Sequence, residues 1–460
     1  MPQYIIELLY LLSGILFIMG LRGMSHPATA RQGMFYAEFG MLIAIIGTLC
    51  QHEIVKWVWI VSGLAIGSIL GLVMGLWVPM TAMPQRTAFS HAFGAAAASL
   101  VGISEYYRHH HSGIPLPPFI IGALGFEVLL GSLTTTGSLI ACGKLQGILP
   151  GKPLVFKGQN IFNMTLLACT VGCFVCLFVH PGVTIFFYVM IALALLFGVL
   201  LVIPIGSADM PVVMSLLNSY AGLASAATGF ALGNNVLIIA GTLDGFSGFI
   251  LSVLMCKAMN RSMANVLFGA FGSVSEQAEA GPGGEMREIG LEDAATQLAY
   301  ARQVVFVPGY GMATAQAQHV IRELADTLEE RGVTVKYAIH PVAGRMPGHM
   351  NVLLAEANVP YSELYELDQI NPDFPSTDVA VVVGANDVVN PDARDNASSP
   401  IAGMPILEVD RAKLAIVLKR GKGRGFSGLE NPLFFKENTA MLYGDAKQTL
   451  TNLVQEVHKL

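Results

Sequence analysis

Five polar residues interrupt long apolar segments in the first part of the chain: His91, Glu127, Asp209, Asn218 and Asp244. An ionisable side chain at membrane depth costs about 2.5–3.5 kcal/mol on insertion scales, and it commonly marks a path for ions or protons. Histidine also takes up and releases a proton near neutral pH. For Asn218 or Asp244 alone, a hydrogen bond between helices is the better explanation, whereas the set as a whole favours a proton path.

Nine apolar segments must position these side chains, and each is long enough to cross a bilayer, which takes about 20 residues. They cover residues 4–21, 35–51, 57–79, 84–104, 118–142, 161–179, 183–204, 210–231 and 234–256. The first lacks a basic leading region and a cleavage site, so we interpret it as a retained helix. From the helical rise, His91 lies about 10 Å and Asn218 about 12 Å from the cytoplasmic ends of their helices. With Glu127 near the middle of its own helix, the three are expected to share one level.

Positive charge predicts the orientation of these segments. Loops on the side of the C-terminus carry eight basic residues: Arg22, Arg31, Arg86, Lys144, Lys152, Lys157, Lys257 and Arg261. Loops on the other side carry two, Lys56 and Arg108. The count places the C-terminal part in the cytoplasm. The run 108–111, Arg-His-His-His, is expected in an outside loop, where solvent exposure is favoured over metal binding.

The composition separates a membrane part from a water-soluble part. Hydrophobic residues make up 53% of the chain and charged residues 13%, against about 25% charged in an ordinary soluble protein. Charges return to normal density from about Glu276 onward. A net charge of −6 with a pI near 6.0 gives no reason to expect a nucleic acid partner; the expected environment is a lipid bilayer.

All six cysteines lie in or beside apolar segments, so a disulfide framework is not expected. Cys169, Cys173 and Cys176 share a helical face, but no histidine or carboxylate joins them. Packing against a neighbouring helix is therefore favoured, and we predict no metal site.

The water-soluble part alternates strand-like and helical patterns. We expect a transmembrane domain over 1–260, a linker or hinge over 261–300 and a nucleotide-binding domain over 301–460. Strands are expected at VVFVP, VTVKYAIH, VAVVVGAN, PILEVD, LAIVLKR and TAMLYG, with helices at about 312–331, 349–358 and 445–459. This order is typical of a Rossmann-like, doubly wound parallel α/β sheet, in which ligands bind at the carboxyl ends of the strands.

The stretch VVFVPGYGMATAQAQHVIREL predicts a strand, a tight Gly309-x-Gly311 turn and a helix whose N-terminus favours a phosphate. Thr314 replaces the third glycine of the usual fingerprint, so the motif alone is weak. The second strand ends in His340 without the acid expected for NAD. A later strand runs into Lys419, Arg420, Lys422 and Arg424, which suit a 2′-phosphate and favour NADP. A solvated loop is the alternative, and GKGRGFSG is interpreted as a basic lid.

The predicted nucleotide contacts follow the ends of the strands. They are Gly309, Tyr310, Gly311, Met312, Ala313, Val342, Ala343, Gly344, Arg345, Met346, Pro347, Gly384, Ala385, Asn386, Asp387, Lys419, Arg420, Lys422, Arg424, Gly425, Gly444 and Asp445. No nucleophile with a partnered base appears in this half of the chain.

Long motifs in both halves resemble one family. GYGMATAQAQ, HPVAGRMPGHMNVLLAEA, GANDVVNP, IAGMPILEV, NPLFFKENTAMLYGDAK, ADMPVVMSLLNSYAG and CKAMNRS are similar to the β subunit of bacterial proton-translocating NAD(P) transhydrogenases. The resemblance covers essentially the whole chain. It implies an NADP(H)-binding domain with reversed dinucleotide orientation and an α subunit that brings NAD(H). It further implies Si/Re-specific hydride transfer between the nicotinamides with passage of one proton, and a heterotetramer of two α and two β subunits in the bacterial inner membrane.

The resemblance also implies roles for particular residues. His91 would be the proton-channel histidine, Asn218 its polar partner, Asp209 a residue at the cytoplasmic mouth and Gly248 a functional position on the last helix. Asp387 would lie near the nicotinamide, while Lys419 and Arg420 would hold the 2′-phosphate. Two positions depart from the family pattern: Gly421 stands in place of a serine, and Asp244 is an unexpected acid.

Hydride exchange between two nicotinamides needs aligned rings and exclusion of water rather than a protein nucleophile, so the missing catalytic constellation agrees with this resemblance. Two other functions stay open. One is a transporter or channel regulated by a nucleotide-sensing Rossmann domain. The other is a membrane-anchored dehydrogenase, for which the water-soluble half has little spare length.

Overall fold

The computed structural model describes the chain except residues 1, 52–55, 113–116, 152, 181, 207–208, 261, 269–285, 347, 398, 400 and 422–428. The chain divides into two compact units. The first consists of Met1–Gly206 with Val212–Ser252, and the second of Ser207–Pro211 with Val253–Leu460. Each unit is built from a different kind of element.

The first unit is helical. In the described part of the chain, nine helices are long and apolar enough to cross a membrane, as expected. They are α1 (Gln3–Met24), α2 (Pro27–Leu49), α3 (Trp57–Leu76), α4 (Met83–Ser112), α5 (Pro118–Gln146), α6 (Gln159–Val179), α7 (Thr184–Val202), α8 (Met210–Leu232) and α9 (Asn235–Ala258). Helix α5 shows how the sequence sets the bounds: it begins at Pro118, whose ring suits a first helical position, and ends before Gly147 in the left-handed conformation.

Helix α4 is longer than expected. The run 108–111 belongs to its last turns and not to an outside loop. Glu105, one turn earlier, forms an ion pair with Arg108 Nη2 (2.9 Å) and also contacts His109 Nε2 (3.0 Å). These contacts between side chains three and four residues apart favour continuation of the helix.

The second unit contains a parallel sheet of six strands in the order β3-β2-β1-β4-β5-β6. The strands are β1 (Gln303–Pro308), β2 (Thr334–Ile339), β3 (Leu364–Glu366), β4 (Val379–Val383), β5 (Leu414–Lys419) and β6 (Thr439–Tyr443). The direction of winding reverses between β1 and β4, which is where doubly wound folds bind their ligands. The predicted fold class is confirmed.

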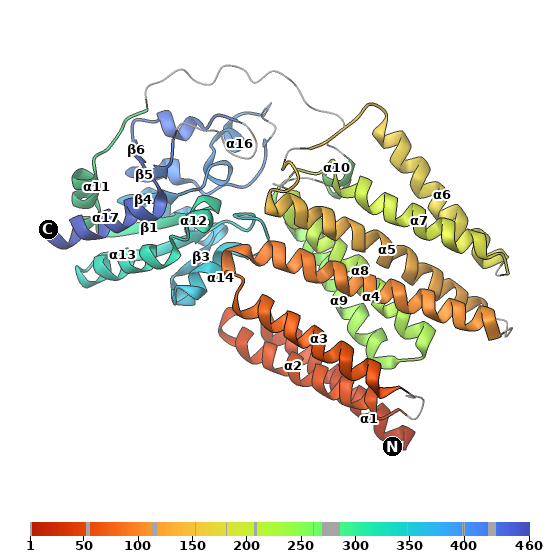
Figure 1. The fold of residues 1–460 in the computed structure, drawn as a ribbon. Helices are drawn as coiled ribbons and strands as arrows, with labels where there is room; N and C mark the ends of the chain where they lie inside the picture. Colours follow the sequence, from red (N-terminus) through yellow and green to blue (C-terminus); the bar gives the residue numbers. More distant parts are fainter. Residues whose placement is uncertain are drawn as a thin grey trace. The chain divides into compact units, whose positions relative to one another are not determined.

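Both faces of this sheet are buried, as near-continuous runs of valine, isoleucine and alanine predict for parallel strands. Helices α11 (Leu291–Ala299), α13 (Gln318–Glu330) and α17 (Ala446–Lys459) pack together beside the sheet (Figure 1). The opposite layer contains short helices and irregular segments, from which Phe374, Leu407 and Phe434 join a core with Val305 and Val382.

Further expectations about the elements differ from the structure. The helix expected over 312–331 is split into α12 (Tyr310–Ala315) and α13, because Gln316 adopts the left-handed conformation (φ 51°). The expected linker contains α11, whose apolar side chains are buried. It also contains the short α10 (Met263–Phe268), and β3 was not expected.

The stretch PILEVD is not a strand. Its backbone does not pair with a neighbouring strand. Asn371 Nδ2 donates to Ile406 O (2.9 Å), Glu408 N donates to Asn371 Oδ1 (3.1 Å), and Leu407 N donates to Val388 O (2.9 Å). Ile406 and Leu407 are nevertheless both buried. The apolar composition of this stretch therefore predicted its burial correctly, but the prediction of a strand was wrong.

Candidate nucleotide site and polar layer

The turns after β1 and β4 contact each other through their backbones. Gly309 N donates to Val383 O, and Gly311 N donates to Gly384 O, each over 2.9 Å. A Cβ atom at Gly311 would lie 2.5 Å from Gly384 Cα, and Gly384 has a φ of 66°. These glycines are therefore required for the contact between the two turns, in addition to any approach of a ligand.

Helix α12 has few side chains that could contact a ligand. Met312 and Ala313 are buried in the protein, so only their backbone can face the carboxyl edge of the sheet. The helix has six residues, which is too short to supply the helix dipole expected from a continuous helix. Because the N–H groups of Gly309 and Gly311 already donate to Val383 O and Gly384 O, only other backbone N–H groups of this turn are left for a phosphate.

The loop after β2 is held by two histidines with depressed pKa values. His340 Nε2 donates to Pro405 O (2.7 Å) and its Nδ1 accepts from Val342 N (3.2 Å), an arrangement that requires the neutral ring. Burial lowers the pKa of His340 to about 4, against the effect of the Pro405 carbonyl. His349 Nδ1 accepts from Arg345 N (3.1 Å), and burial together with the Arg345 charge lowers its pKa to about 4.

Arg345 links this loop to the glycine turn. Its guanidinium carbon lies 4.3 Å from the centroid of the Tyr310 ring, a distance that gives a cation–π contact. Burial lowers the pKa of Arg345 and raises that of Tyr310. The structure thus brings together two predicted contact residues from the ends of β1 and β2. His349, which fixes the backbone of Arg345, was missed; only its place inside HPVAGRMPGHMN pointed to it.

The ends of β4 and β5 also meet. Lys419 Nζ lies 4.4 Å from the centroid of the Phe434 ring. Burial lowers the pKa of Lys419, while the carboxylates of Asp387 and Glu430 act in the opposite direction. Asn386 is held by Asn431, whose Nδ2 donates to the Asn386 carbonyl oxygen (3.0 Å). A cation and a carboxylate from adjacent strand ends therefore share one electrostatic environment.

The predicted contacts after β5 and β6 lie away from the glycine turn or are engaged with the protein itself. Arg420 is exposed, and Gly444 N donates to Lys419 O (3.0 Å), which joins the ends of β5 and β6. Asp445 is occupied as the N-cap of α17, where it accepts from Lys447 N and Gln448 N. Pro347, Lys422, Arg424 and Gly425 lie outside the described residues.

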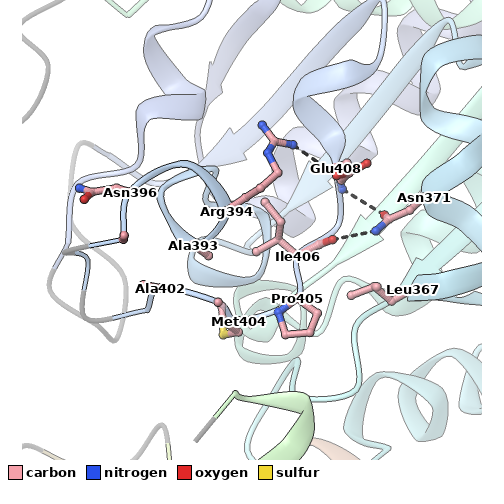
Figure 2. Close-up of a pocket in the computed structure, with 12 residues that line it drawn as sticks. Leu367, Asn371, Ala393, Arg394, Asn396, Ala402, Met404, Pro405, Ile406 and Glu408 are labelled. Atoms are coloured by element: carbon pink, nitrogen blue, oxygen red, sulfur yellow. Dashed lines mark hydrogen bonds and ion pairs between the residues drawn. The ribbon is translucent and has the colours of Figure 1, made fainter.

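A cavity of about 580 Å³ lies in the same unit and contains none of the predicted nucleotide contacts. Figure 2 shows its lining, in which Arg394, Glu408 and Asn371 are bonded to other groups of the protein. Arg394 forms ion pairs with Asp395, Glu408 and Asp410, and Asn371 bonds the backbone on both sides of Leu407. The cavity therefore adds no group to the nucleotide site.

In the first unit, helices α4 and α5 run antiparallel in a defined register. Gln85 Nε2 donates to Leu145 O (3.1 Å), and the hydroxyls of Ser99 and Ser132 lie 3.4 Å apart. His91 is six residues beyond Gln85 along α4, so its level on α5 is about six residues before Leu145, near residue 139.

The register places Asn218 at the level of His91, as expected. A Cβ atom at Gly137 of α5 would lie 3.0 Å from Leu217 Cδ2 of α8, so Asn218 lies within about one helical turn of the level of His91. The buried Ser138 hydroxyl and His91 Nε2 are also at this level, and neither has a hydrogen-bond partner in the described residues. Ser138 was missed, because a serine in an apolar helix commonly bonds its own backbone.

Glu127 does not share this level, contrary to expectation. It packs against Gly102 of α4, where an added Cβ atom would lie 3.0 Å from the carboxyl carbon. Glu127 is fully buried. At 1.5 Å per residue it lies about 18 Å from the level of His91. The sequence placed it near the middle of its segment, but antiparallel packing brings that point opposite a different part of α4.

Asn218 and Gly248 meet between α8 and α9. Asn218 Nδ2 donates to Asp244 Oδ1 over 2.9 Å, and a Cβ atom at Gly248 would lie 3.0 Å from the same Nδ2. Asp209 directly precedes α8. The structure thus brings Asn218 together with Gly248 and with Asp244, which the sequence had singled out as a polar residue. We call His91, Asn218 and Asp244 the polar layer.

Comparison with known proteins gives matches that extend over both halves of the chain. A family model described as NAD(P) transhydrogenase beta subunit matches residues 6–456. NAD(P) transhydrogenase subunit beta of Rhodospirillum rubrum is 49% identical over 456 residues, which is 98% of each chain. The protein of the same name from a specified strain of that species matches to the same extent.

Proposed function

The chain belongs to the NAD(P) transhydrogenase β-subunit family, and from this premise we propose that it binds NADP(H) and couples hydride transfer to proton passage. The proposed partner is an α subunit that binds NAD(H), in a heterotetramer of two α and two β subunits. The complex would lie in the bacterial inner membrane with the sheet domain in the cytoplasm and act as a Si/Re-specific, proton-translocating enzyme. The observation that carries the proposal is the full-length family match.

The residues at the carboxyl edge of the sheet fit a dinucleotide with a 2′-phosphate. Strand β2 is followed directly by the buried, neutral His340, so no carboxylate is present at this position to accept a ribose 2′-hydroxyl. Strand β5 ends in Lys419 and is followed by Arg420. Two adjacent cations suit the charge of a phosphate monoester. The joined turns at Gly311 and Gly384 allow backbone approach to the pyrophosphate.

When bound, NADP(H) supplies the nicotinamide carbon that accepts or donates the hydride. The chain itself has to orient that ring and exclude water, because this reaction needs no protein nucleophile. Tyr310 and Arg345 hold the glycine turn against the loop after β2, which favours a fixed ring position. Asp387, in the electrostatic environment of Lys419, is the group we assign to the coupling of protonation with NADP(H) affinity.

The membrane residues would carry the proton. His91 and Asn218 lie at one level of the helix bundle, and histidine is a side-chain type suited to carrying a proton. Glu127 and Asp209 are proposed at other depths of the same path. A membrane potential supplies about 2.3 kcal/mol per charge per 100 mV. It can drive hydride transfer only if the protonation states differ in their NADP(H) affinity.

The test is reconstitution of the chain with its α partner in liposomes, with hydride transfer and internal pH recorded together. Wild type is expected to move protons during turnover, whereas His91→Ala is expected to abolish proton movement. Hydride transfer without any pH change in wild type would contradict the coupling. Proton conduction without redox turnover would instead support a transporter that senses the nucleotide.

Cofactor choice is tested separately by nucleotide titration of Lys419→Ala and Arg420→Ala. Each variant is expected to lose affinity for NADPH by about tenfold or more, since a charge-assisted contact contributes roughly 1.5–3 kcal/mol, while weak NADH binding stays unchanged. Lys413→Ala, which removes an exposed lysine paired with Asp378, is the control. An equal effect on NADH and NADPH would contradict a 2′-phosphate contact.

A further inference from the structure

The bond between Asn218 and Asp244 depends on the close approach of α8 and α9. At Gly222 of α8 an added Cβ atom would lie 2.6 Å from Gly245 Cα of α9. At Gly248 it would lie 2.8 Å from Ser219 N. The absence of side chains at these glycines lets the two backbones touch. The helix pair therefore has one register, and that register places the amide of Asn218 against the carboxylate of Asp244.

Asp244 lies deep in the membrane part. It is the tenth residue of α9, which has 24 residues, so it lies about 14 Å from the beginning of that helix. Through Asn218 it shares the level of His91. Its side chain is exposed on the surface of the helix pair, so exchange of a proton is not blocked by the packing of α8 and α9.

A hydrogen bond that only holds two helices together does not need an acid at this depth. An amide or hydroxyl would accept the bond from Asn218 Nδ2 without the cost of a charge, which is about 2.5–3.5 kcal/mol for an aspartate at the centre of a membrane helix. Among the residues that the structure describes, the Asp244 carboxylate is bonded to Asn218 and forms no ion pair with a cation. Arg22 on α1 and Tyr220 on α8 lie within about one helical turn of the Asp244 level, since Gly14 of α1 contacts Ile239 of α9. Neither side chain is bonded to Asp244 in the described residues. Lys257 on α9 and Glu127 and Lys144 on α5 lie at other levels.

We propose that Asp244 is a further proton-carrying residue of this chain and acts with Asn218 at the level of His91. This inference rests on the proposed proton translocation. In the ionised state Oδ1 accepts the hydrogen bond from Asn218 Nδ2. A proton from the aqueous medium then forms an O–H bond at Oδ2, which neutralises the side chain and leaves the bond to Asn218 intact. Release of that proton restores the carboxylate, so Asp244 undergoes no net change.

The experiment uses the full chain reconstituted with its α partner, and it records internal pH and NADPH formation in the same liposomes. Asp244→Asn keeps the size of the side chain and an oxygen that accepts from Asn218, but it cannot be ionised. We expect it to lower the rate of proton movement by about tenfold or more, the lower range for losing a positioned acid–base group. Asp244→Glu is expected to retain most of the wild-type rate.

The exchanged pair Asn218→Asp with Asp244→Asn gives a second measurement. It keeps one carboxylate and one amide at the same bond, so we expect proton movement to recover relative to Asp244→Asn. Ser247→Ala, which removes the hydroxyl that bonds the Asp244 backbone carbonyl, is the control and should behave as wild type. NADPH binding by each variant shows whether the sheet domain is still folded.

The outcomes separate the two proposals. If wild type moves no protons, the proposed function fails, whatever Asp244 does. If wild type moves protons and Asp244→Asn moves them equally fast, the assignment of Asp244 is overturned. A loss in Asp244→Asn that neither Asp244→Glu nor the exchanged pair restores assigns Asp244 to packing and also overturns it.

Discussion

The amide nitrogen of Gly311 donates to the carbonyl oxygen of Gly384 over 2.9 Å, so the turns that follow β1 and β4 form one backbone unit. These two strands flank the point at which the sheet reverses its winding. A displacement of either turn is therefore transmitted to the other, and the proposed ligand contacts on both turns depend on one glycine pair.

Gly384→Ala is expected to disrupt this unit. Alanine at a φ of 66° costs about 1 kcal/mol, and its methyl group would also overlap the Gly311 backbone, which adds roughly 1–3 kcal/mol. Gly332→Ala is the matched control, because Gly332 has a φ of 84° but open space around it. Thermal unfolding of the purified complex and titration with NADPH provide the measurement. Equal effects of the two substitutions would contradict a steric role for Gly384.

Stability is expected to depend on pH through His340. Because burial lowers its pKa to about 4 in the folded chain, the unfolded chain, with a pKa near 6.5, binds the proton first as the pH falls. The contribution is complete above pH 6.5 and is lost progressively between pH 6.5 and 4, by up to about 3 kcal/mol. His340→Gln should flatten this part of the stability profile, whereas His319→Gln, at an exposed position, should leave it unchanged.

Asp410 is expected to be a major electrostatic support of the sheet domain. Its side chain is only 4% exposed and accepts bonds from Arg394 Nη2 (2.8 Å) and Lys436 Nζ (2.6 Å). Burial acts to raise its pKa, but these two bonds prevail and hold the pKa below its ordinary value. Asp410→Asn should lower the free energy of unfolding by about 3 kcal/mol at neutral pH, since it leaves two cations without their shared carboxylate.

The sign of the pH effect provides the check on Asp410. Because the folded pKa is depressed, the contribution of the carboxylate is present above pH 4 and is lost as the pH falls further. The difference between wild type and Asp410→Asn should therefore shrink at acidic pH. Glu456→Gln removes an ion pair with the exposed Lys459 and should cost at most about 0.5 kcal/mol. A difference independent of pH would contradict an ionic role.

Lys144 is expected to stabilise the end of α7. It is fully buried, and its Nζ donates to Ile203 O and, over 2.7 Å, to Ile205 O. These carbonyls follow the last turn of α7, where helical partners are missing. Lys144→Met should lower stability by about 2 kcal/mol, measured as the unfolding temperature in detergent. Lys157→Met, at an exposed position, should have little effect. Equal shifts of the unfolding temperature in the two variants would contradict a role of Lys144 in capping the end of α7.

The sequence by itself determined the elements whose signals are local. Nine apolar segments and a run of short buried strands are set by composition and period, so the fold class was predictable from them. Strand-end residues were predictable for the same reason, because parallel strands bring their carboxyl ends to one edge. The stretch PILEVD shows the limit: burial is encoded in Ile406 and Leu407, but the backbone partners of this stretch, Asn371 and Val388, are distant in the chain and do not form a strand with it.

Tertiary structure decided which polar residues meet. Position along a helix predicts depth, but not which residues of a neighbouring helix lie opposite, because that depends on helix register. The packing of α4 against α5 separates Glu127 from the level of His91. The glycine contacts between α8 and α9 join Asn218 to Asp244. Both results arise from contacts between distant segments, which exist only once the chain is packed.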